Sequence, residues 1–525
     1  MVLHDYKANI GKKLETWFSK FQIFGSLSFS ILLALLFLFG SPSLVSAIYP
    51  PLPTQFENFT GEIIVVTDEH NHAMAAYSDG FTGGISTYYF SNNVWNYMPL
   101  NPVNVLLVDL SMDPSGTALL TYRDQFTNDL RSFYFNGTMW IAPSNDPLDL
   151  GITNGGDLAI NDSGLGVATW SDSGNNIRVA FFSNGNWGTP SLPGAIGIGV
   201  SPRVAINANG DLVVAWELGA SIVVSHYIGA VWTAPTPVAP LAFLQGVGFA
   251  NNGKSLVLIR DSATSNVLAS LFIGGVFNST TLLNPPQPFG PANFGLNLEM
   301  APNGTAVATW QYSQTFFNQF DLYYAQFNGN TWAPAVDFQT GIEGIAPAVS
   351  LNSEGDALFL WGNGFNFPNP LAYYIARLPV GGALTGIQLI RSSASTNPPG
   401  ASVSLADNGF SALAWLESNP RDDFARPFGL ASVIPAGPLG LKGRVCKNHF
   451  ASQTGCANII TWDPFPNTSI VSYNLERNGV LIANILANAP LIYRDNQCCK
   501  KRNVYTLFAV DADGIIGIPS TITLN

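Results

Sequence analysis

Apolar and polar positions follow one pattern that recurs eight times between Gly61 and Pro435. Its clearest copy, Pro202 to Trp216, reads PRVAINANGDLVVAW: an apolar run, a polar turn with glycine, and a second apolar run that ends in an aromatic residue. Two short alternating runs joined by an Asn-Gly turn predict a β-hairpin. We assign the turn position to His72, Gly116, Gly164, Gly210, Gly253, Gly304, Gly355 and Gly409, at spacings of 44, 48, 46, 43, 51, 51 and 54 residues.

Each repeat is long enough for two further strands. In the fourth repeat we expect strands at Arg203–Asn207, Asp211–Glu217, Ser221–Ile228 and Val231–Ala234. Four antiparallel strands in about 45 residues, repeated without helix signals, predict the blades of a β-propeller.

The ends of the repeat region indicate how the ring closes. The eighth repeat shows three strands, ASVSL, SALAWLE and FGLASVI, but no clear fourth. We expect Pro50–Thr60 to supply that strand, because closure by both termini removes free sheet edges. Both end repeats keep their first three strands, so eight blades fit better than seven. The first unit has His72 in place of glycine, so a ring of seven blades stays the alternative.

Aromatic residues recur at two places in the repeats. One set ends the second strand and the other lies in the fourth strand, and the recurrence favours packing between blades over sugar platforms. The first set is Tyr77, Tyr122, Trp170, Trp216, Trp310, Trp361 and Trp415, with Ile259 in the fifth repeat; the second is Trp95, Trp140, Trp187, Trp232, Phe277 and Trp332.

The first 47 residues have the layout of a secretory signal. A lysine-containing start precedes an apolar run from Phe24 to Phe39, and Val45-Ser46-Ala47 offers a small-residue cleavage site. The alternative is an uncleaved anchor, but the run is short for a membrane-spanning helix. No later stretch is long and apolar enough to span a membrane, so we expect an exported protein, extracellular, on the cell surface or in the periplasm.

The charge composition limits the classes of partner that the chain is expected to bind. Only 11% of the 525 residues are charged, and residues 48–437 carry 10 Lys and Arg against 27 Asp and Glu, a net charge of −17. An acidic surface argues against nucleic acid, which needs a basic footprint. It is compatible with cations such as calcium, with neutral glycans and with basic proteins.

From Pro438 the pattern changes, and residues 438–525 resemble a fibronectin type III domain. Ile460–Pro464, with Trp462, looks like the second strand, and Val471–Ile482 looks like the third strand and its turn. Tyr493–Asp495, Val504–Gly514 and Ser520–Leu524 look like the last three strands. The resemblance implies a seven-stranded sandwich that serves as a spacer or binding module, without catalysis. The whole layout resembles exported bacterial repeat proteins.

All four cysteines, Cys446, Cys456, Cys498 and Cys499, lie in this segment. The resemblance places Cys456 in the loop after the first strand and Cys498 and Cys499 in the loop before the sixth, at one end of the sandwich. It therefore implies a disulfide from Cys456 to Cys498 or Cys499. Export makes disulfides the default, and a leftover cysteine could bridge to another chain. A zinc site lacks the usual C-x2-C spacing.

An acidic pattern follows the second strands, on the face of a propeller that usually binds ligands. Its functional interpretation is a rim that binds a cation, a basic patch or sugar hydroxyls. The alternative is that aspartate suits hairpin ends, where it bonds its own backbone, and we favour this alternative. The residues are Asp79, Asp124, Asp172, Asp261, Glu217 and Glu417.

Enzyme signatures are lacking in the sequence. It contains no sialidase Asp-box, no G-x-S-x-G elbow and no H-E-x-x-H pair, and His226 in a third strand suits a structural role. We assign no catalytic residue and no metal ligand. Two rim carboxylates could still act as acid and base on a glycosidic bond.

The longest repeats locate the expected contact residues. We expect extended loops at Gln311–Phe320, Gly362–Pro370 and Asn419–Pro427, with contacts from Phe316, Phe317, Phe365, Phe367 and Phe424. The sequence thus favours an exported binding or adhesion protein for a protein or glycan ligand. A carbohydrate-active enzyme is the alternative, and a disulfide-linked envelope protein is a third interpretation.

Overall fold

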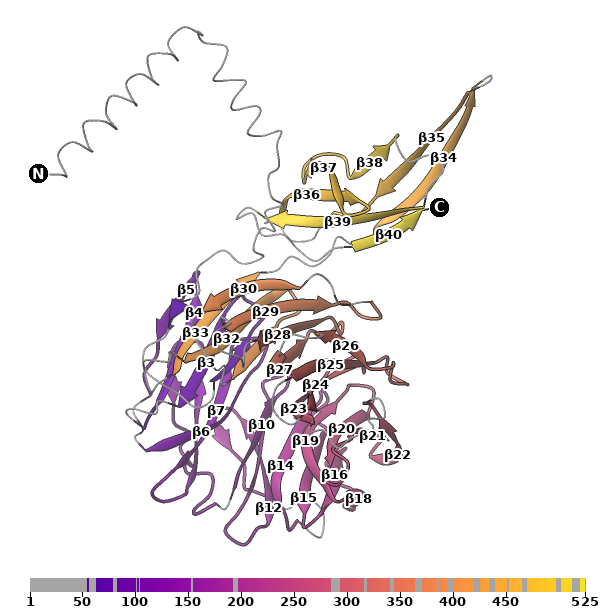
Figure 1. Ribbon diagram of the computed structural model, residues 1–525. Coiled ribbons are helices and arrows are strands. Elements are labelled where there is room, and N and C mark those ends of the chain that lie inside the picture. Colours follow the sequence, from indigo (N-terminus) through magenta and orange to yellow (C-terminus); the bar gives the residue numbers. More distant parts are fainter. Residues whose placement is uncertain are drawn as a thin grey trace, which may run out of the picture. The chain divides into compact units, whose positions relative to one another are not determined.

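The computed structural model describes residues 54–55, 63–78, 83–100, 102, 104–152, 154–191, 197–284, 293–315, 319–339, 344–363, 371–382, 384, 387–393, 400–418, 425–433, 440–450, 453–464, 470–496, 502–511 and 520–524. Their regular structure is entirely β-strand (Figure 1). No helix in this part of the chain is long and apolar enough to cross a membrane. The predicted signal segment lies outside these residues.

The first four repeats each form an antiparallel sheet. The first sheet contains β2 (Ile63–Thr67), β3 (Ala73–Ser78), β4 (Ile85–Ser91) and β5 (Val94–Tyr97). The second contains β6 (Val105–Met112), β7 (Ala118–Asp124), β8 (Leu130–Phe135) and β9 (Trp140–Ile141). The third contains β10 (Asn154–Ile160), β11 (Gly166–Ser171), β12 (Ile177–Ser183) and β13 (Asn186–Trp187). The fourth contains β14 (Val200–Ile206), β15 (Leu212–Leu218), β16 (Ser221–Ile228), β17 (Val231–Trp232) and β18 (Thr236–Pro240).

The remaining four repeats continue the series. The fifth sheet contains β19 (Ala242–Phe249), β20 (Lys254–Asp261), β21 (Val267–Ile273) and β22 (Val276–Leu282). The sixth contains β23 (Asn293–Met300), β24 (Ala306–Thr315), β25 (Gln319–Phe327) and β26 (Val336–Gln339). The seventh contains β27 (Gly344–Leu351), β28 (Ala357–Asn363), β29 (Leu371–Leu378) and β30 (Gln388–Ser393). The eighth contains β31 (Ala401–Leu405), β32 (Phe410–Ser418), β33 (Ala425–Val433) and the N-terminal β1 (Thr54–Gln55).

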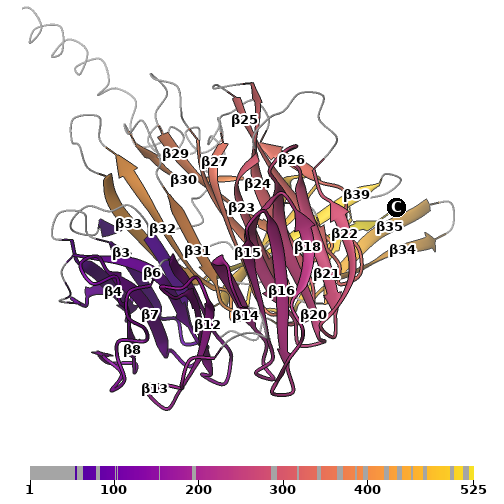
Figure 2. The same cartoon turned by 90° about the horizontal axis from the view of Figure 1, so that it is seen from below.

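The sheets close into a ring. Strand β1 pairs with β33, with Thr54 opposite Gly429, which confirms the expectation that a segment before the first repeat completes the last sheet. The indigo strands of the first sheet lie beside the orange strands of the eighth (Figure 1, Figure 2). Among the described residues, an apolar core fills the space between each pair of neighbouring sheets, including the eighth and the first. This arrangement is propeller-like.

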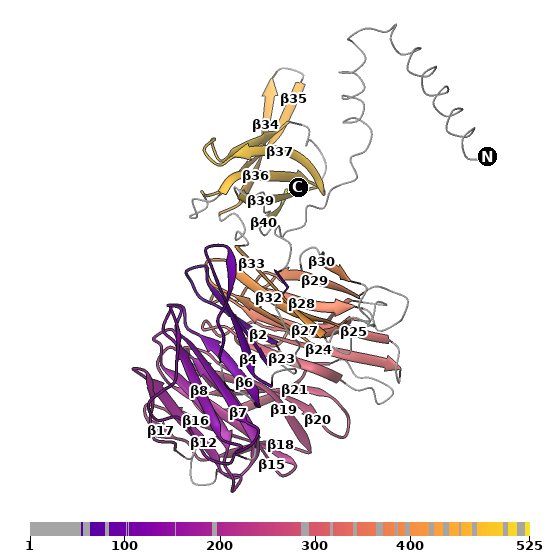
Figure 3. The ribbon, with the colours of Figure 1, turned by 90° about the vertical axis from the view of Figure 1, so that its left-hand side faces the viewer.

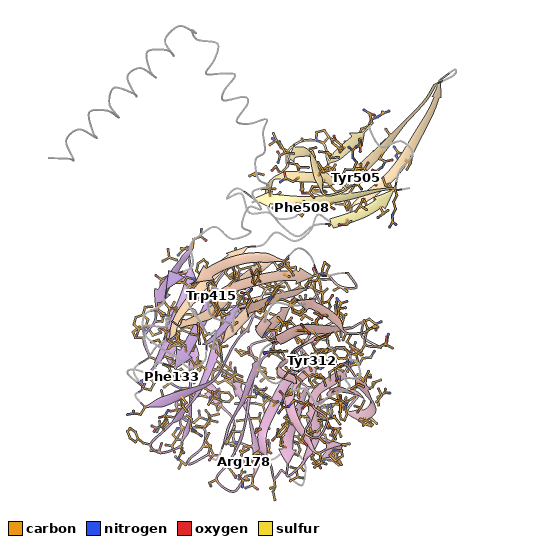
Figure 4. All side chains as sticks on the ribbon, in the orientation of Figure 1. Phe133, Arg178, Tyr312, Trp415, Tyr505 and Phe508 are labelled. Atoms are coloured by element: carbon orange, nitrogen blue, oxygen red, sulfur yellow. The ribbon has the colours of Figure 1, made fainter. Side chains whose placement is uncertain are left out.

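Aromatic residues form much of these cores, as the sequence predicts. All eight side chains at the end of the second strands are buried, Trp415 among them (Figure 4). Several stack on a ring of the third strand, as Trp310 does on Tyr323. Fourth-strand tryptophans reach the preceding sheet: the Trp187 indole nitrogen donates to Ser132 Oγ at 2.9 Å. Phe277 differs, because its ring is substantially exposed on β22.

The turns between first and second strands share one backbone hydrogen bond, from the N–H of the first turn residue to the carbonyl four residues later, and in five repeats an Asp or Asn side chain adds further bonds. In the fourth repeat, Asn207 Oδ1 accepts the backbone N–H groups of Asn209 and Asp211, and the Gly210 N–H donates to the Asn207 carbonyl. The glycine has a positive φ of 81°, which side-chain-bearing residues adopt rarely. These polar side chains also bond across sheets, as Asn207 Nδ2 does to the Ala250 carbonyl at 3.5 Å.

The first repeat corrects one sequence assignment. The Asp68 N–H donates to the His72 carbonyl, as the Asp113 N–H donates to the Thr117 carbonyl in the second repeat. Asn71, with φ of 64°, therefore occupies the glycine position, and His72 is the residue after it. The error arose because asparagine also tolerates the left-handed conformation.

The C-terminal segment forms two antiparallel sheets (Figure 3). One contains β34 (Lys442–Phe450), β35 (Gln453–Thr461) and β38 (Ile492–Asp495). The other has the order β37 (Val480–Leu486), β36 (Ile470–Arg477), β39 (Asn503–Asp511) and β40 (Ser520–Leu524). Trp462, Tyr473 and Tyr505 lie in one apolar core, and Trp462 is buried as expected.

One cysteine position differs from the expectation. Cys456 lies within β35, not in a loop, because the first hairpin is longer than expected. In the register of β34 and β35, Lys447 is opposite Cys456 and Cys446 is opposite Ala457. Cys498 and Cys499 lie outside the described residues, so the implied disulfide stays a prediction.

Candidate binding face

The ring has two faces, which carry different turns. Strand β6 begins at Val105, opposite Asp124 at the end of β7, so the segments that precede first strands and follow second strands meet on one face. We call this the loop face. The opposite face carries the turns between first and second strands, and we call it the hairpin face.

The predicted acidic rim residues on the loop face form hydrogen bonds with the turns that they start. Asp124 Oδ1 accepts the N–H groups of Phe126 at 2.8 Å and Thr127 at 3.1 Å. The Thr127 bond, with that of Phe126, lowers the pKa of the Asp124 carboxyl. Asp261 Oδ1 makes the same bonds to Ala263 and Thr264 at 3.0 and 2.7 Å. These geometries agree with the interpretation of aspartate as a turn-forming residue.

Asp172 and Glu217 also have partners within the protein. Asp172 accepts the Asn176 N–H and pairs with Arg178 at 2.8 Å. Burial alone would raise the pKa of Asp172, but its hydrogen bonds to Asn176, Arg178 and Gly174 outweigh burial and leave the pKa lowered. Glu217 Oε1 accepts the Leu244 N–H at 3.0 Å and so links the fourth sheet to the fifth.

Several other predicted site residues lie outside the described part of the chain. They are Asp79, Phe316, Phe317, Phe365, Phe367 and Phe424, and for Glu417 the structure describes only the backbone, in β32. The expected loop at Gln311–Phe320 is shorter than predicted, because β24 continues to Thr315 and β25 begins at Gln319. The contact roles of all these residues stay predictions.

The loop face carries exposed apolar side chains that the sequence did not single out. They come from the second to fifth sheets, and Phe126 and Leu150 are 77% and 66% exposed. We call them the loop-face apolar set: Leu106, Phe126, Leu150, Ile198, Val200, Leu218, Leu241 and Phe243. Exposed apolar groups gathered on one face mark interaction surfaces.

Backbone hydrogen bonds bring members of this set together in two groups. The Gln125 N–H donates to the Asn104 carbonyl and the Ile152 N–H to the Asn128 carbonyl, which joins the segments that carry Leu106, Phe126 and Leu150. The Ala242 N–H donates to the Ala220 carbonyl, which joins the segments that carry Leu218, Leu241 and Phe243. The Arg260 guanidinium lies 4.9 Å from the centre of the Phe243 ring.

The first strands carry a second polar feature at the centre of the ring. Asp109 Oδ2 accepts the Leu158 N–H at 2.9 Å, and Asp157 Oδ2 accepts the Val204 N–H at 2.8 Å, so each carboxylate links one first strand to the next. Asp157 also pairs with Arg203 at 3.1 Å. Burial and the Asp157 charge raise the pKa of Asp109 well above its usual value.

Glu299 is the exceptional residue of this inner region. It lies one residue before Met300, which is the last residue of β23 paired with β24. At the same position six other repeats have a small uncharged residue: Ser111, Ala159, Ala205, Gly248, Ser350 and Ser404. Its side chain contacts water, but surrounding protein and the Asp157 charge raise its pKa to about 7. The described residues contain no group of three or more His, Cys, Asp or Glu side chains that could hold a metal ion.

His226 has a structural environment, as the sequence suggested. Its ring is buried between Phe249 and Phe272, and Nε2 lies 2.7 Å from Ser255 Oγ. Burial lowers its pKa to about 4, so the ring is neutral at physiological pH.

Comparison with known proteins identifies no family. No family model matches the chain, and no curated protein matches it. Among solved structures, puromycin hydrolase is 13% identical over 70% of this chain with a TM-score of 0.41, and the chain spans 60% of its length. YCF48 from Cyanidioschyzon merolae is 12% identical over 65% of this chain and 97% of its own, with a TM-score of 0.37.

A third solved structure is the fucose-specific lectin from Aleuria aurantia. It is 12% identical over 66% of this chain and 99% of its own, with a TM-score of 0.35. All three are β-propeller-like proteins. This chain is an all-β, propeller-like repeat protein.

Proposed function

We propose that the chain is an exported binding protein, in which an eight-bladed propeller carries the ligand site and a fibronectin type III module follows it. Eight successive sheets with closure of the last by β1 support the blade number. The strand order of the two C-terminal sheets, three strands against four around Trp462, supports the module. The layout of residues 1–47 supports export.

The ligand site of this proposal is the loop face. The loop-face apolar set is the observation that carries it, because soluble proteins rarely leave such side chains gathered without a partner. The carboxylates of Asp124, Asp172 and Asp261 on this face do not fit the role of a general acid. They serve as hydrogen-bond acceptors with lowered pKa values, and a general acid needs a raised one.

We favour a protein ligand over a glycan. Most of the apolar set is aliphatic, whereas sugar platforms need open aromatic faces, and Arg260 already stands over Phe243. The net charge of −17 on residues 48–437 favours a partner whose contact surface is apolar at its centre and basic at its rim.

Binding to arrays of secreted proteins and of glycans, with and without calcium, tests this proposal. The test variant is Phe126→Ser combined with Leu150→Ser on the loop face. The matched control is Val94→Ser combined with Met139→Ser, which removes exposed apolar side chains outside the loop-face apolar set.

We expect the unmodified chain and the control variant to bind a protein on the array, and the loop-face variant to lose that binding. Equal binding by both variants would overturn the choice of face. Binding of a defined sugar set alone would replace the protein ligand by a glycan and justify assays for hydrolysis.

A further inference from the structure

The first turn of the ring, between β2 and β3, departs from the other seven in chemistry. Its sequence is Asp68-Glu69-His70-Asn71-His72. Positions His70 and His72 correspond to Ser115 and Thr117 in the second repeat. The other repeats have varied residues at these two positions, such as Asn209 and Asp211 in the fourth, and none of them has histidine. Two imidazoles in one turn of the common scaffold are therefore candidates for a functional role.

The geometry of this turn brings the two positions together in other repeats. Ser115 Oγ and Thr117 Oγ1 are 3.5 Å apart, and Thr305 Oγ1 lies 2.7 Å from Asn303 Oδ1 at the corresponding positions of the sixth repeat. In the first repeat the His70 and His72 ring centres are 6.3 Å apart with planes inclined by 22°, and the Tyr89 ring lies 5.4 Å from that of His72. To share one ion with His72, the more exposed His70 side chain would turn about its own bonds. The side chains are 63% and 34% exposed.

A buried carboxylate fixes the orientation of one ring. Asp68 is buried, its Oδ1 accepts the N–H groups of His70 and His72, and its Oδ2 lies 2.7 Å from His72 Nδ1. An ionised carboxylate only accepts hydrogen bonds, so His72 Nδ1 must be the donor. Neutral His72 therefore carries its lone pair on Nε2. A carboxylate behind an imidazole in this way is the usual support of a metal-binding histidine.

We propose that His70 and His72 bind one borderline divalent transition-metal ion, Zn²⁺ or Cu²⁺, through their imidazole nitrogens, with water in the other positions. Imidazole suits these ions and not calcium, which prefers oxygen ligands. The excess of acidic residues in the repeats favours cation binding. Glu69 is not a ligand, because its carboxylate accepts the N–H groups of Asp407 and Asn408 across the ring closure.

Copper titration of the chain without a polyhistidine tag tests the site. The measurement is electron paramagnetic resonance of Cu²⁺, which reports nitrogen ligands directly, supported by calorimetry with Zn²⁺. We expect one ion per chain, bound more tightly for Cu²⁺ than for Zn²⁺. His70→Gln and His72→Gln should each remove the two-nitrogen spectrum, and His449→Gln is the matched control.

The Asp68→Asn variant distinguishes an effect on metal binding from an effect on folding. Asn161 and Asn207 fill the same turn position in other repeats, so the turn should form and the unfolding temperature should change little. An amide nitrogen in place of Oδ2 would donate to His72 Nδ1 and place the ring proton on Nε2. We expect the affinity for Cu²⁺ to fall about 10- to 100-fold.

Two outcomes would overturn the proposal. One is failure of the unmodified chain to bind either ion. The other is a nitrogen spectrum that persists in the His70→Gln, His72→Gln double variant.

Discussion

At the scale of single residues, two titratable side chains give the ring opposite responses to pH. His226 has a pKa of about 4 in the folded protein, below its value of 6.5 in the unfolded chain. The unfolded chain thus binds the extra proton between pH 6.5 and pH 4, so stability falls as the pH is lowered through that window. The loss reaches about 3 kcal/mol when the full shift is counted.

Replacement His226→Gln tests this contribution, because glutamine retains a polar group near Ser255 and does not titrate. We expect the free energy of unfolding, measured in denaturant at pH 7.5 and pH 4.5, to fall less on acidification in the variant. The exposed His70→Gln serves as control. Identical pH dependence in His226→Gln and the unmodified chain would contradict the assignment.

Glu299 makes stability depend on pH in the opposite direction. Its pKa rises from 4.5 to about 7 on folding, so the folded chain binds the extra proton between these values and stability falls as the pH rises through them. Glu299→Gln should therefore raise the unfolding temperature at pH 8 and change little at pH 4. The gain should be below about 1 kcal/mol, because water reaches this carboxyl and screens its charge.

The matched control for Glu299 is Glu354→Gln, an exposed residue on the hairpin face. Calorimetry at pH 4, 6 and 8 would show the difference. An equal effect of Glu299→Gln at all three values would exclude a perturbed carboxyl as the cause.

At the scale of elements, the first strands approach one another closely enough to restrict side-chain size. A Cβ at Gly248 would lie 2.4 Å from Met300 Cβ on the next first strand. Gly248→Ala should therefore lower the free energy of unfolding by about 1–3 kcal/mol, the usual penalty of overpacking.

Gly400→Ala is the control for this change. Its Cβ would meet only Leu416 Cδ1 at 3.7 Å, an ordinary contact. We expect no measurable loss in urea unfolding for this variant. A comparable loss in both variants would point to the general effect of replacing glycine and not to the close approach.

Elements were predictable from sequence where the decisive interactions are local. The Ser221–Ile228 and Ala401–Leu405 strands follow from their apolar patterns and flanking turns, with bounds as predicted. The turn role of Asp124, Asp172 and Asp261 was also visible, because each carboxylate accepts N–H groups of its own turn and so depends on nearby backbone. The bond of Glu217 to Leu244 in the next sheet was not visible from spacing.

The loop-face apolar set could not be predicted in this way. Leu150 and Leu241 lie in segments between sheets, and their exposure depends on how those segments cross the loop face. Leu150 stands between Asp149 and Gly151, and Leu241 adjoins the apolar run Ala242–Leu244, so neither local pattern distinguishes a buried side chain from an exposed one. The elevated pKa of Glu299 likewise depends first on the protein packed around it and then on the charge of Asp157, which lies 142 positions earlier in the sequence.

At the scale of the whole molecule, the ring depends on a contact between its two ends. Removing residues before Gly61 deletes β1 and leaves β33 with an open edge. The bonds of Val65 to Ser402 and of Glu69 to Asp407 remain, so we expect a folded but weaker ring. The expected loss is about 1–2 kcal/mol, from the ladder bonds at two paired positions.

Thermal unfolding of chains that begin at Ile48 and at Gly61 would measure this loss. The shorter chain should unfold at a lower temperature and associate more readily through the exposed edge. Equal unfolding temperatures would show that the contacts of the first and eighth sheets close the ring without β1.

The turn scheme on the hairpin face also affects how the protein ages chemically. Asparagine followed by glycine deamidates when the glycine nitrogen attacks the side-chain amide carbon. Four such pairs lie in these turns, at Asn209, Asn252, Asn303 and Asn408, and each following glycine N–H already donates to a carbonyl three residues earlier. The bond that shapes each turn therefore holds back the attacking nitrogen, which lets the chain keep asparagine at these four turns over a long lifetime.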